Sequence, residues 1–326
     1  MRFFGIERAE KVFLKGKIVG FRKSRRESML DWVDRMLQAT ALKFINLTAQ
    51  QAPVSHQPQK GRTRVPNLIR FCITACLVLS VLGGSYSLPS GVFAEELAIA
   101  SASDLNFAMK EMVNKFEIAT GAKVNVSFGS SGHFFAQIQN GAPFDLYFSA
   151  DIGYPKKLEE AGLTVSGTLY RYAVGRIVLW VLKTSKLDIA QGLDVLRNSG
   201  IKKVAIANPK HAPYGRAAVS AMNYFQVYNS AKERLAFGGS VSQAAQFVES
   251  GAADIGIIAL SLALSPTMKT AGRYWEVPLE AHPAIEQGAV LLKRSTRQEL
   301  AKRFLEFMKG SEAREIMRRY GFTLPS

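Results

Sequence analysis

The sequence predicts an α/β fold, because short apolar runs alternate with stretches of helical periodicity from about residue 95 to the end of the chain. Residues 97–100 have the apolar composition of a buried strand. Apolar side chains then recur at helical spacing from Leu105 to Phe116, and Gly121 ends this stretch. Strands that alternate with helices in this way favour mostly parallel sheets covered by helices.

The later elements follow the same alternation. Further strands are expected at 124–128, 146–148, 204–207, 255–259 and 289–292. Helices are expected through Phe135 and Ile138 to Gly141, at 217–225, at 241–248, and from Ser295 and Ser311 onwards.

The composition is that of a globular chain, and its charge is unevenly distributed. The 326 residues are 48% hydrophobic and 21% charged, with a formal net charge of +16. Residues 1–94 contain 15 Lys and Arg against 5 Asp and Glu, so this segment holds most of the positive excess. The remaining chain is only mildly basic. That charge favours the approach of anions at low salt and gives no reason to expect nucleic acid.

A secretory signal peptide is predicted over residues 65–94, which places the mature protein in the periplasm. Basic residues precede an apolar run at 71–82, which is shorter than the roughly 20 residues needed to span a bilayer. Small residues then lead to an expected cleavage site before Glu95. Both cysteines lie inside the apolar run, so the mature chain would contain none, and a lipid-anchored cysteine is disfavoured.

Residues 1–64 form an extension in front of this signal. A signal peptide normally begins near the first residue, so the extension is interpreted as a mis-assigned start, with Val65 read as an alternative start codon. No function is assigned to it.

Four predicted helix starts share one chemistry. Each combines small or hydroxyl residues with free backbone N–H groups and contains no Lys or Arg: 101–104 (SASD), 129–132 (GSSG), 212–215 (APYG) and 238–241 (GGSV). Such ends attract anions through unpaired donors and the helix dipole. A single Ser or Gly before a helix is usually only a cap. Four in one chain, two early and two late, would converge on the cleft of a two-lobed α/β protein.

The sequence resembles the periplasmic molybdate-binding proteins of molybdate ABC transporters, in order from about residue 95 to 326. The matching motifs are 102–105 (ASDL), 128–132 (FGSSG), 141–151 (GAPFDLYFSAD), 208–215 (NPKHAPYG), 256–261 (GIIALS), 283–289 (PAIEQGA) and 321–325 (GFTLP). The resemblance implies the two-lobed type II periplasmic binding fold, with a mixed, mostly parallel sheet in each lobe and the ligand cleft between them. It places one lobe at 95–175 plus 277–326 and the other at 176–276.

The resemblance also implies the ligand and its site. Molybdate or tungstate would be bound as the oxyanion, with no cofactor and no direct protein–metal bond. Ser103 and Ser131 would donate from the first lobe through hydroxyl and backbone N–H, and Tyr214 and Val241 from the second. Where some relatives have a ligand-binding tyrosine this sequence has Ala259, so the Tyr214 hydroxyl is expected to replace it. The partners implied are the permease subunits of an ABC transporter, with the binding protein acting as a monomer.

Other interpretations stay open. A binding protein for sulfate, thiosulfate or another tetrahedral oxyanion would share the fold and the donors. A hydrolase is the alternative of another class, since Ser131 lies near His133 and His211 near Tyr214. However, 129–132 lacks the G-x-S-x-G pattern and no metal-spaced histidines occur. Asp104 is interpreted as a helix N-terminal carboxylate, with a general base or proton acceptor as the alternative. The neutral donors predict little pH dependence near neutrality.

Overall fold

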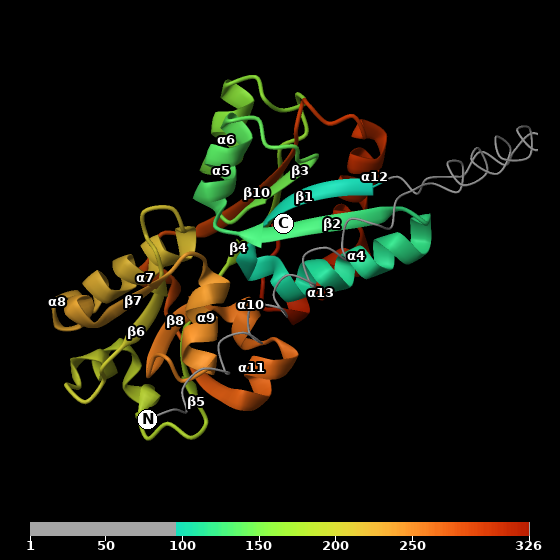
Figure 1. Cartoon of the computed structure of the whole chain (residues 1–326). Coiled ribbons are helices and arrows are strands. Elements are labelled where there is room, and N and C mark those ends of the chain that lie inside the picture. Colours follow the sequence, from blue (N-terminus) through green and yellow to red (C-terminus); the bar gives the residue numbers. More distant parts are fainter. Residues whose placement is uncertain (1–95, 326) are drawn as a thin grey trace, which may run out of the picture. The chain divides into compact units, whose positions relative to one another are not determined.

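Two five-stranded sheets organise the computed structural model, which describes residues 96–325 (Figure 1). The predicted signal peptide (65–94) and the extension predicted before it (1–64) lie outside the described residues. Within the described part, no helix has the length and apolarity required to cross a membrane. We call the part built on the first sheet the first lobe and the part built on the second sheet the second lobe.

The first sheet combines strands from both ends of the described chain. Its strands in spatial order are β2 (Lys123–Gly129), β1 (Glu96–Ala102), β3 (Leu146–Ser149), β10 (Ile285–Leu291) and β4 (Tyr170–Gly175). β1 pairs in parallel with β2 and β3, whereas β10 runs antiparallel to both β3 and β4. The first lobe is therefore formed by strands from the start of the described chain together with β10 from near its end.

The second sheet has the same arrangement and is built from strands β5 to β9, which lie in sequence between β4 and β10. In spatial order they are β7 (Leu235–Gly238), β6 (Val204–Ala207), β8 (Ile255–Ala259), β5 (Ile177–Leu182) and β9 (Gly272–Glu276). β6 pairs in parallel with β7 and β8, and β5 is antiparallel to β8 and β9. Two mixed sheets with flanking helices confirm the expected two-lobed α/β fold class.

Helices connect the strands in both lobes. The first lobe contains η2 (Ser103–Leu105), α4 (Asn106–Thr120), α5 (Ser131–Gln139), α6 (Gly153–Glu160), α12 (Gln298–Lys309) and α13 (Ser311–Arg319). The second contains η3 (Ile189–Arg197), α7 (Pro213–Tyr224), α8 (Tyr228–Ala231), η4 (Lys232–Arg234), α9 (Val241–Glu249), α10 (Leu260–Ala263) and α11 (Pro266–Ala271). A further 3₁₀ turn, η5 (Leu279–Ala281), precedes β10. As predicted, α4 ends at Gly121, whose φ of 71° is the left-handed conformation that favours glycine.

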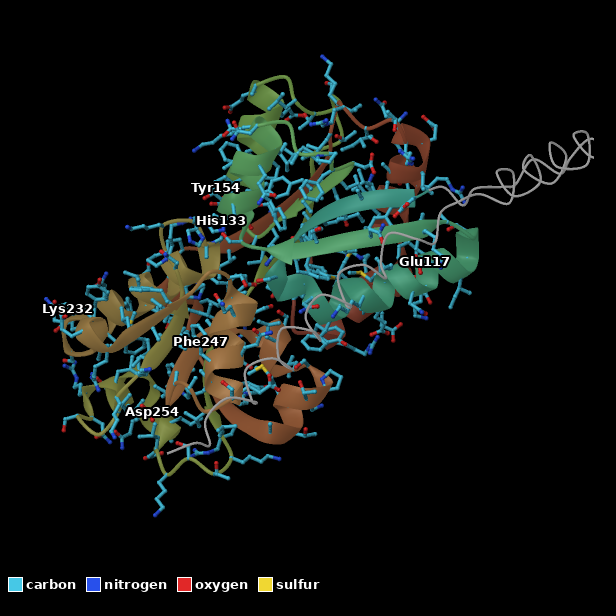
Figure 2. All side chains as sticks on the ribbon, in the orientation of Figure 1. Glu117, His133, Tyr154, Lys232, Phe247 and Asp254 are labelled. Carbon is cyan, nitrogen blue, oxygen red and sulfur yellow. The ribbon has the colours of Figure 1, made fainter. Side chains whose placement is uncertain are left out.

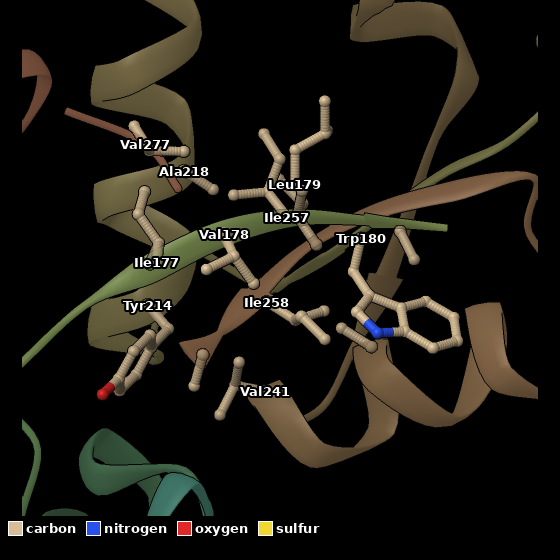
Figure 3. Packing of buried hydrophobic residues seen from close by; sticks show 14 of the residues in the cluster. Ile177, Val178, Leu179, Trp180, Tyr214, Ala218, Val241, Ile257, Ile258 and Val277 are labelled. Carbon is tan, nitrogen blue, oxygen red and sulfur yellow. The ribbon is translucent and has the colours of Figure 1, made fainter. Parts of the chain in front are cut away.

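Alternating side chains of the first sheet enter different cores. Ile99 and Phe148 pack on one face with α4, α12 and α13, whereas Ala100 and Tyr147 pack on the other with α5 and α6. The second lobe has its own core around β5, in which Trp180 is fully buried (Figure 3). Each sheet is thus covered by helices and leaves the ends of its strands free to carry a site.

Two sequence expectations differ from the structure. The helix expected from Ser295 begins only at Gln298, because the Ser295 hydroxyl donates a 2.6 Å hydrogen bond to Asp145 Oδ1 and does not cap the helix. The last strand begins at Ile285, four residues before the expected position. Its first part was not recognised in the sequence because the polar residues Glu286 and Gln287 interrupt the apolar run.

Candidate ligand-binding site

Each of the four glycine- and serine-rich junctions does begin a helix. Ser103 opens the short η2 turn that leads into α4, Ser131 opens α5, Pro213 opens α7 and Val241 opens α9. Two of these helices belong to the first lobe and two to the second. The predicted helix starts are therefore confirmed.

Capping does not explain the serines at the first two of these junctions, 101–104 and 129–132. Only Ser240 caps its helix through its side chain, by accepting from Gln243 N at 3.3 Å. The cap positions before η2, α5 and α7 make no side-chain capping bond. The Ser103 and Ser131 hydroxyls thus have a role other than helix capping.

The Ser103 and Ser131 hydroxyls are buried donors whose own hydrogen is not used. The two residues are 3% and 1% exposed. Ser103 Oγ accepts from Ser242 N at 3.3 Å, and Ser131 Oγ accepts from Ala150 N at 2.9 Å. Neither hydroxyl donates a hydrogen bond to any residue between 96 and 325, so each retains a hydrogen for an external acceptor.

Three backbone N–H groups at the helix starts are also buried donors without an acceptor. Those of Ser131, Tyr214 and Val241 donate to no acceptor in the described part of the chain, and all three residues are at most 4% exposed. A buried N–H without an acceptor is costly and uncommon in proteins. Three such groups at helix N-termini indicate that an acceptor from outside the chain is needed.

Hydrogen bonds between the lobes bring these residues together. Ser242 Oγ, one residue after Val241, donates to Ser103 O at 2.7 Å. Gly132 N, one residue after Ser131, donates to His211 O at 3.0 Å, three residues before Tyr214. All four predicted site residues therefore lie where the two lobes meet, with two contributed by each lobe.

Asp104 bridges the lobes in a way that the sequence did not predict. The Tyr214 hydroxyl donates to Asp104 Oδ2 at 2.9 Å, and Gln287 Nε2 donates to the same oxygen at 2.7 Å and to the Tyr214 hydroxyl at 3.0 Å. Gly175 makes room for the group, because a Cβ there would collide with the Tyr214 hydroxyl. In Figure 3 this hydroxyl points away from the surrounding hydrophobic side chains.

The electrostatics of this group follow from its burial. Asp104 is 1% exposed, and desolvation raises its pKa to about 6 although the hydrogen bonds from Gln287 and Tyr214 oppose the shift. Burial, together with the neighbouring Asp104 carboxylate, raises the pKa of Tyr214 well above its usual value. The Tyr214 hydroxyl therefore remains protonated and directs that proton to Asp104.

Reasoning from sequence missed Gln287 and Ser261. Gln287 is fully buried in β10, and the Ser261 hydroxyl donates to Asp104 O at 2.7 Å from the start of α10. The only local signal for Gln287 was a polar residue beside Glu286 in a strand whose remaining residues are apolar or glycine. Ala259 is fully buried as the last residue of β8.

A polar cavity of about 550 Å³ opens beside Ser103 between the lobes. Its lining is composed mainly of hydroxyl and amide side chains, including Asn106, Ser242 and Gln243, with Phe128 and Phe134. No Lys, Arg, Asp or Glu of the described residues lines it. His133 also lines the cavity, so the approach to Ser103 is polar and is formed by hydroxyl, amide, imidazole and phenyl groups.

The histidines near the site do not form the serine–histidine–carboxylate arrangement of a hydrolase with Ser131. Ser130, and not Ser131, contacts His211: its hydroxyl lies 2.9 Å from Nδ1 and donates to the His211 carbonyl oxygen at 2.6 Å. His133 stacks on His211, and Figure 2 labels it on α5 with Tyr154 on α6. No carboxylate orients either imidazole, and between residues 96 and 325 no group of His, Cys, Asp and Glu has the arrangement of a metal site.

Comparisons with known proteins agree with this architecture. A family model for bacterial extracellular solute-binding proteins matches residues 97–323. The molybdate-binding protein of Azotobacter vinelandii is 40% identical over 246 residues, which cover 76% of this chain and 97% of that protein. The molybdate-binding protein of Rhodobacter capsulatus is 38% identical over 260 residues, covering 80% and 98%.

A solved structure also matches. The periplasmic molybdate-binding protein of Azotobacter vinelandii superimposes with a TM-score of 0.67 and 35% identity, covering 71% of this chain and all of that one. A family model that spans nearly all described residues and relatives near 40% identity both identify the family. The chain belongs to the bacterial extracellular solute-binding proteins.

Proposed function

We propose that this chain is an extracytoplasmic solute-binding protein that captures molybdate or tungstate and delivers it to an ABC importer. One observation carries the proposal: five buried donors at the meeting of the lobes lack an acceptor. They are the hydroxyls of Ser103 and Ser131 and the backbone N–H groups of Ser131, Tyr214 and Val241.

A tetrahedral dianion fits these donors. It presents four acceptor oxygens and no hydrogen, whereas all five groups donate. Hydrogen bonds to a charged group contribute roughly 1.5–3 kcal/mol each, so several of them are sufficient for tight binding without a cationic side chain. The Tyr214 hydroxyl directs its hydrogen to Asp104, so we assign the ligand contact of Tyr214 to its backbone N–H.

The choice of molybdate or tungstate among oxyanions is supported by the relatives, two of which are named for molybdate and are 38–40% identical. Sulfate or thiosulfate is the alternative ligand, because the same donors serve any tetrahedral oxyanion. The ion is cargo here. Its oxygens accept from the protein, and no side chain binds the metal atom.

The proposal includes a location and a partner. The mature protein would begin at Glu95 after export, act as a monomer in the periplasm and dock on permease subunits at the membrane. Mass spectrometry of periplasmic protein from cells expressing the full chain tests the export step, since a product that retains residues 1–94 would contradict it. We propose no enzymatic activity, because the Ser130–His211 pair lacks an orienting carboxylate.

Isothermal titration calorimetry tests the ligand. Protein purified after expression of the full chain is titrated with molybdate, tungstate, sulfate, thiosulfate and phosphate at neutral pH. We expect tight binding of molybdate and tungstate and at least a hundredfold weaker binding of the others. If sulfate or thiosulfate binds as tightly as molybdate, the alternative ligand replaces the proposed one.

A further inference from the structure

Asp104 occupies an unusual electrostatic position beside the proposed site. It directly follows Ser103, is 1% exposed, and is joined to the second lobe by Tyr214 and to β10 by Gln287. Both side-chain bonds go to Oδ2. The backbone N–H groups of Asp104 and Leu105 lie near the carboxylate and favour its charged form. Among the described residues, however, buried Oδ1 accepts no hydrogen bond, and neither does buried Gln287 Oε1. Two buried acceptor oxygens without donors in one cluster leave an unoccupied position for a hydrogen.

No positive charge compensates this carboxylate. The titratable groups that face it are two phenols, Tyr214 from α7 and Tyr172 from β4. β10 contributes the neutral Gln287 and α10 the neutral Ser261, and no Lys or Arg of the described residues forms a hydrogen bond with the Asp104 carboxylate. Burial and the nearby Asp104 carboxylate raise the pKa of both phenols well above the usual value, so neither is an additional source of negative charge.

An oxyanion bound at Ser103 would bring two further negative charges next to Asp104. Like charges within a few ångströms in a buried site favour the neutral form of a carboxyl group. Protonation of Oδ1 removes the repulsion and leaves both hydrogen bonds to Oδ2 in place. The group already lies close to this state, since desolvation raises the Asp104 pKa to about 6 before any anion is present.

We propose that Asp104 is a proton-linked positioning residue, which takes up one proton from solvent when the oxyanion binds and holds the Tyr214 helix start against Ser103 in that neutral form. The inference rests on the proposed function. It replaces the expectation that affinity varies little near neutral pH: the affinity of the wild-type protein should fall as pH rises above the Asp104 pKa of the ligand-free protein.

Calorimetry in buffers that carry no oxyanion and differ in ionisation enthalpy tests the proposal. With molybdate at pH 7–7.5, we expect the wild-type protein to take up a large part of one proton. Its dissociation constant should rise by up to about tenfold per pH unit between the free and bound titrations. Asp104→Asn resembles the neutral carboxyl, so it should bind molybdate with no linked proton and with a flat pH profile.

Asp151→Asn is the matched control. Asp151 is the other carboxylate that joins the lobes, through a 2.5 Å ion pair with Arg216, and its removal should leave the proton uptake unchanged. Any proton taken up by His211, whose pKa burial lowers, would also be taken up in Asp104→Asn, so that variant separates the two sources.

Infrared difference spectra of the wild-type protein give a second readout that needs no variant. A carbonyl band of a protonated buried carboxyl should appear when molybdate is added. Molybdate binding with no buffer dependence and no such band would overturn the proton linkage alone, as would equal uptake in Asp104→Asn. No molybdate binding by wild-type protein at any pH would overturn the proposed function with it.

Discussion

The hydroxyls of Ser103 and Ser131 each accept one hydrogen bond inside the protein and keep their own hydrogen free. Loss of a hydrogen bond to a charged ligand costs roughly 1.5–3 kcal/mol. We therefore expect Ser103→Ala and Ser131→Ala each to weaken molybdate binding by about 10- to 150-fold, measured by titration calorimetry.

A capping serine outside the site is the control for these variants. Ser265 is also fully buried, and its hydroxyl caps α11 by accepting from Met268 N at 3.4 Å. Ser265→Ala should lower the free energy of unfolding by about 0.5–2 kcal/mol and leave the affinity unchanged. Unchanged affinity in both Ser103→Ala and Ser131→Ala would mean that their hydroxyls do not contact the ligand.

The raised pKa of Asp104 also predicts that the unfolding free energy of the ligand-free protein depends on pH. Its pKa rises from 3.8 to about 6 on folding, so the folded protein binds this proton more tightly than the unfolded chain. The stabilisation is complete below the unfolded pKa and is lost as pH rises through about 6. From pH 4 to pH 7, the unfolding free energy of wild-type protein should fall by about 2–3 kcal/mol relative to Asp104→Asn.

Urea unfolding of both proteins across this pH range measures the difference. Contributions of other titrating groups cancel in the comparison, because only residue 104 differs. A difference that stays constant from pH 4 to pH 7 would contradict a raised pKa at Asp104.

At the level of elements, the helix starts must approach closely across the lobe boundary. Gly132 lies in the first turn of α5, and a Cβ there would be 2.6 Å from His211 O and 2.9 Å from the Tyr154 hydroxyl. Gly132→Ala should therefore move α5 away from the 208–213 segment and lengthen the bond from residue 132 N to His211 O. We expect at least tenfold weaker molybdate binding with little loss of stability.

Gly200→Ala is a suitable comparison, since an added Cβ there meets only the flexible Asn198 side chain at 3.1 Å. Its affinity for molybdate should equal that of wild-type protein in the same calorimetric titration. Equal affinities for both glycine variants would show that the approach of α5 to the second lobe does not position the donors.

The helix starts were predictable from sequence, whereas the contacts between them were not. Small and hydroxyl residues mark a helix start locally, and the resemblance assigned Ser103, Ser131, Tyr214 and Val241 a common ligand. The bonds from Asp104 to Tyr214 and Gln287 join residues 110 and 183 positions apart, and they depend on how the two lobes meet. No local pattern encodes such a distance.

The strands show the same limit. Apolar runs such as 204–207 and 255–259 were recognisable because each is followed or preceded by a clear helical pattern. Four strands were missed. Two of them, β5 (IVLWVL) and β7 (LAFG), are mainly apolar and did carry a local signal. The other two, β4 and β9, mix aromatic and charged residues (YRYAVG and GRYWE) and owe their place to pairing with β10 and β5. Position in a sheet, and not local composition, makes these segments strands.

At the level of the whole molecule, the lobes meet through polar contacts such as Tyr214–Asp104 and Arg216–Asp151 and through small apolar residues such as Ala102 and Ala150. The Arg216–Asp151 pair is more than one-third exposed on both sides, and exposed pairs of this kind contribute only about 0–1 kcal/mol. The buried donors that lack acceptors oppose closure until an anion satisfies them. A ligand that bridges both lobes should therefore account for most of the stabilisation of the closed state.

Thermal unfolding measures that stabilisation directly. Ligand at one hundred times its dissociation constant stabilises the folded state by about 2.7 kcal/mol, which for a protein of this size corresponds to a Tm increase of about 5–10 °C. Molybdate and tungstate should each produce this increase. Sulfate is a smaller tetrahedron, so donors placed for the larger ion would stretch beyond about 3.2 Å and several bonds would weaken together. Millimolar sulfate or phosphate should therefore shift Tm little, and an equal shift with sulfate would contradict specificity for the larger ions.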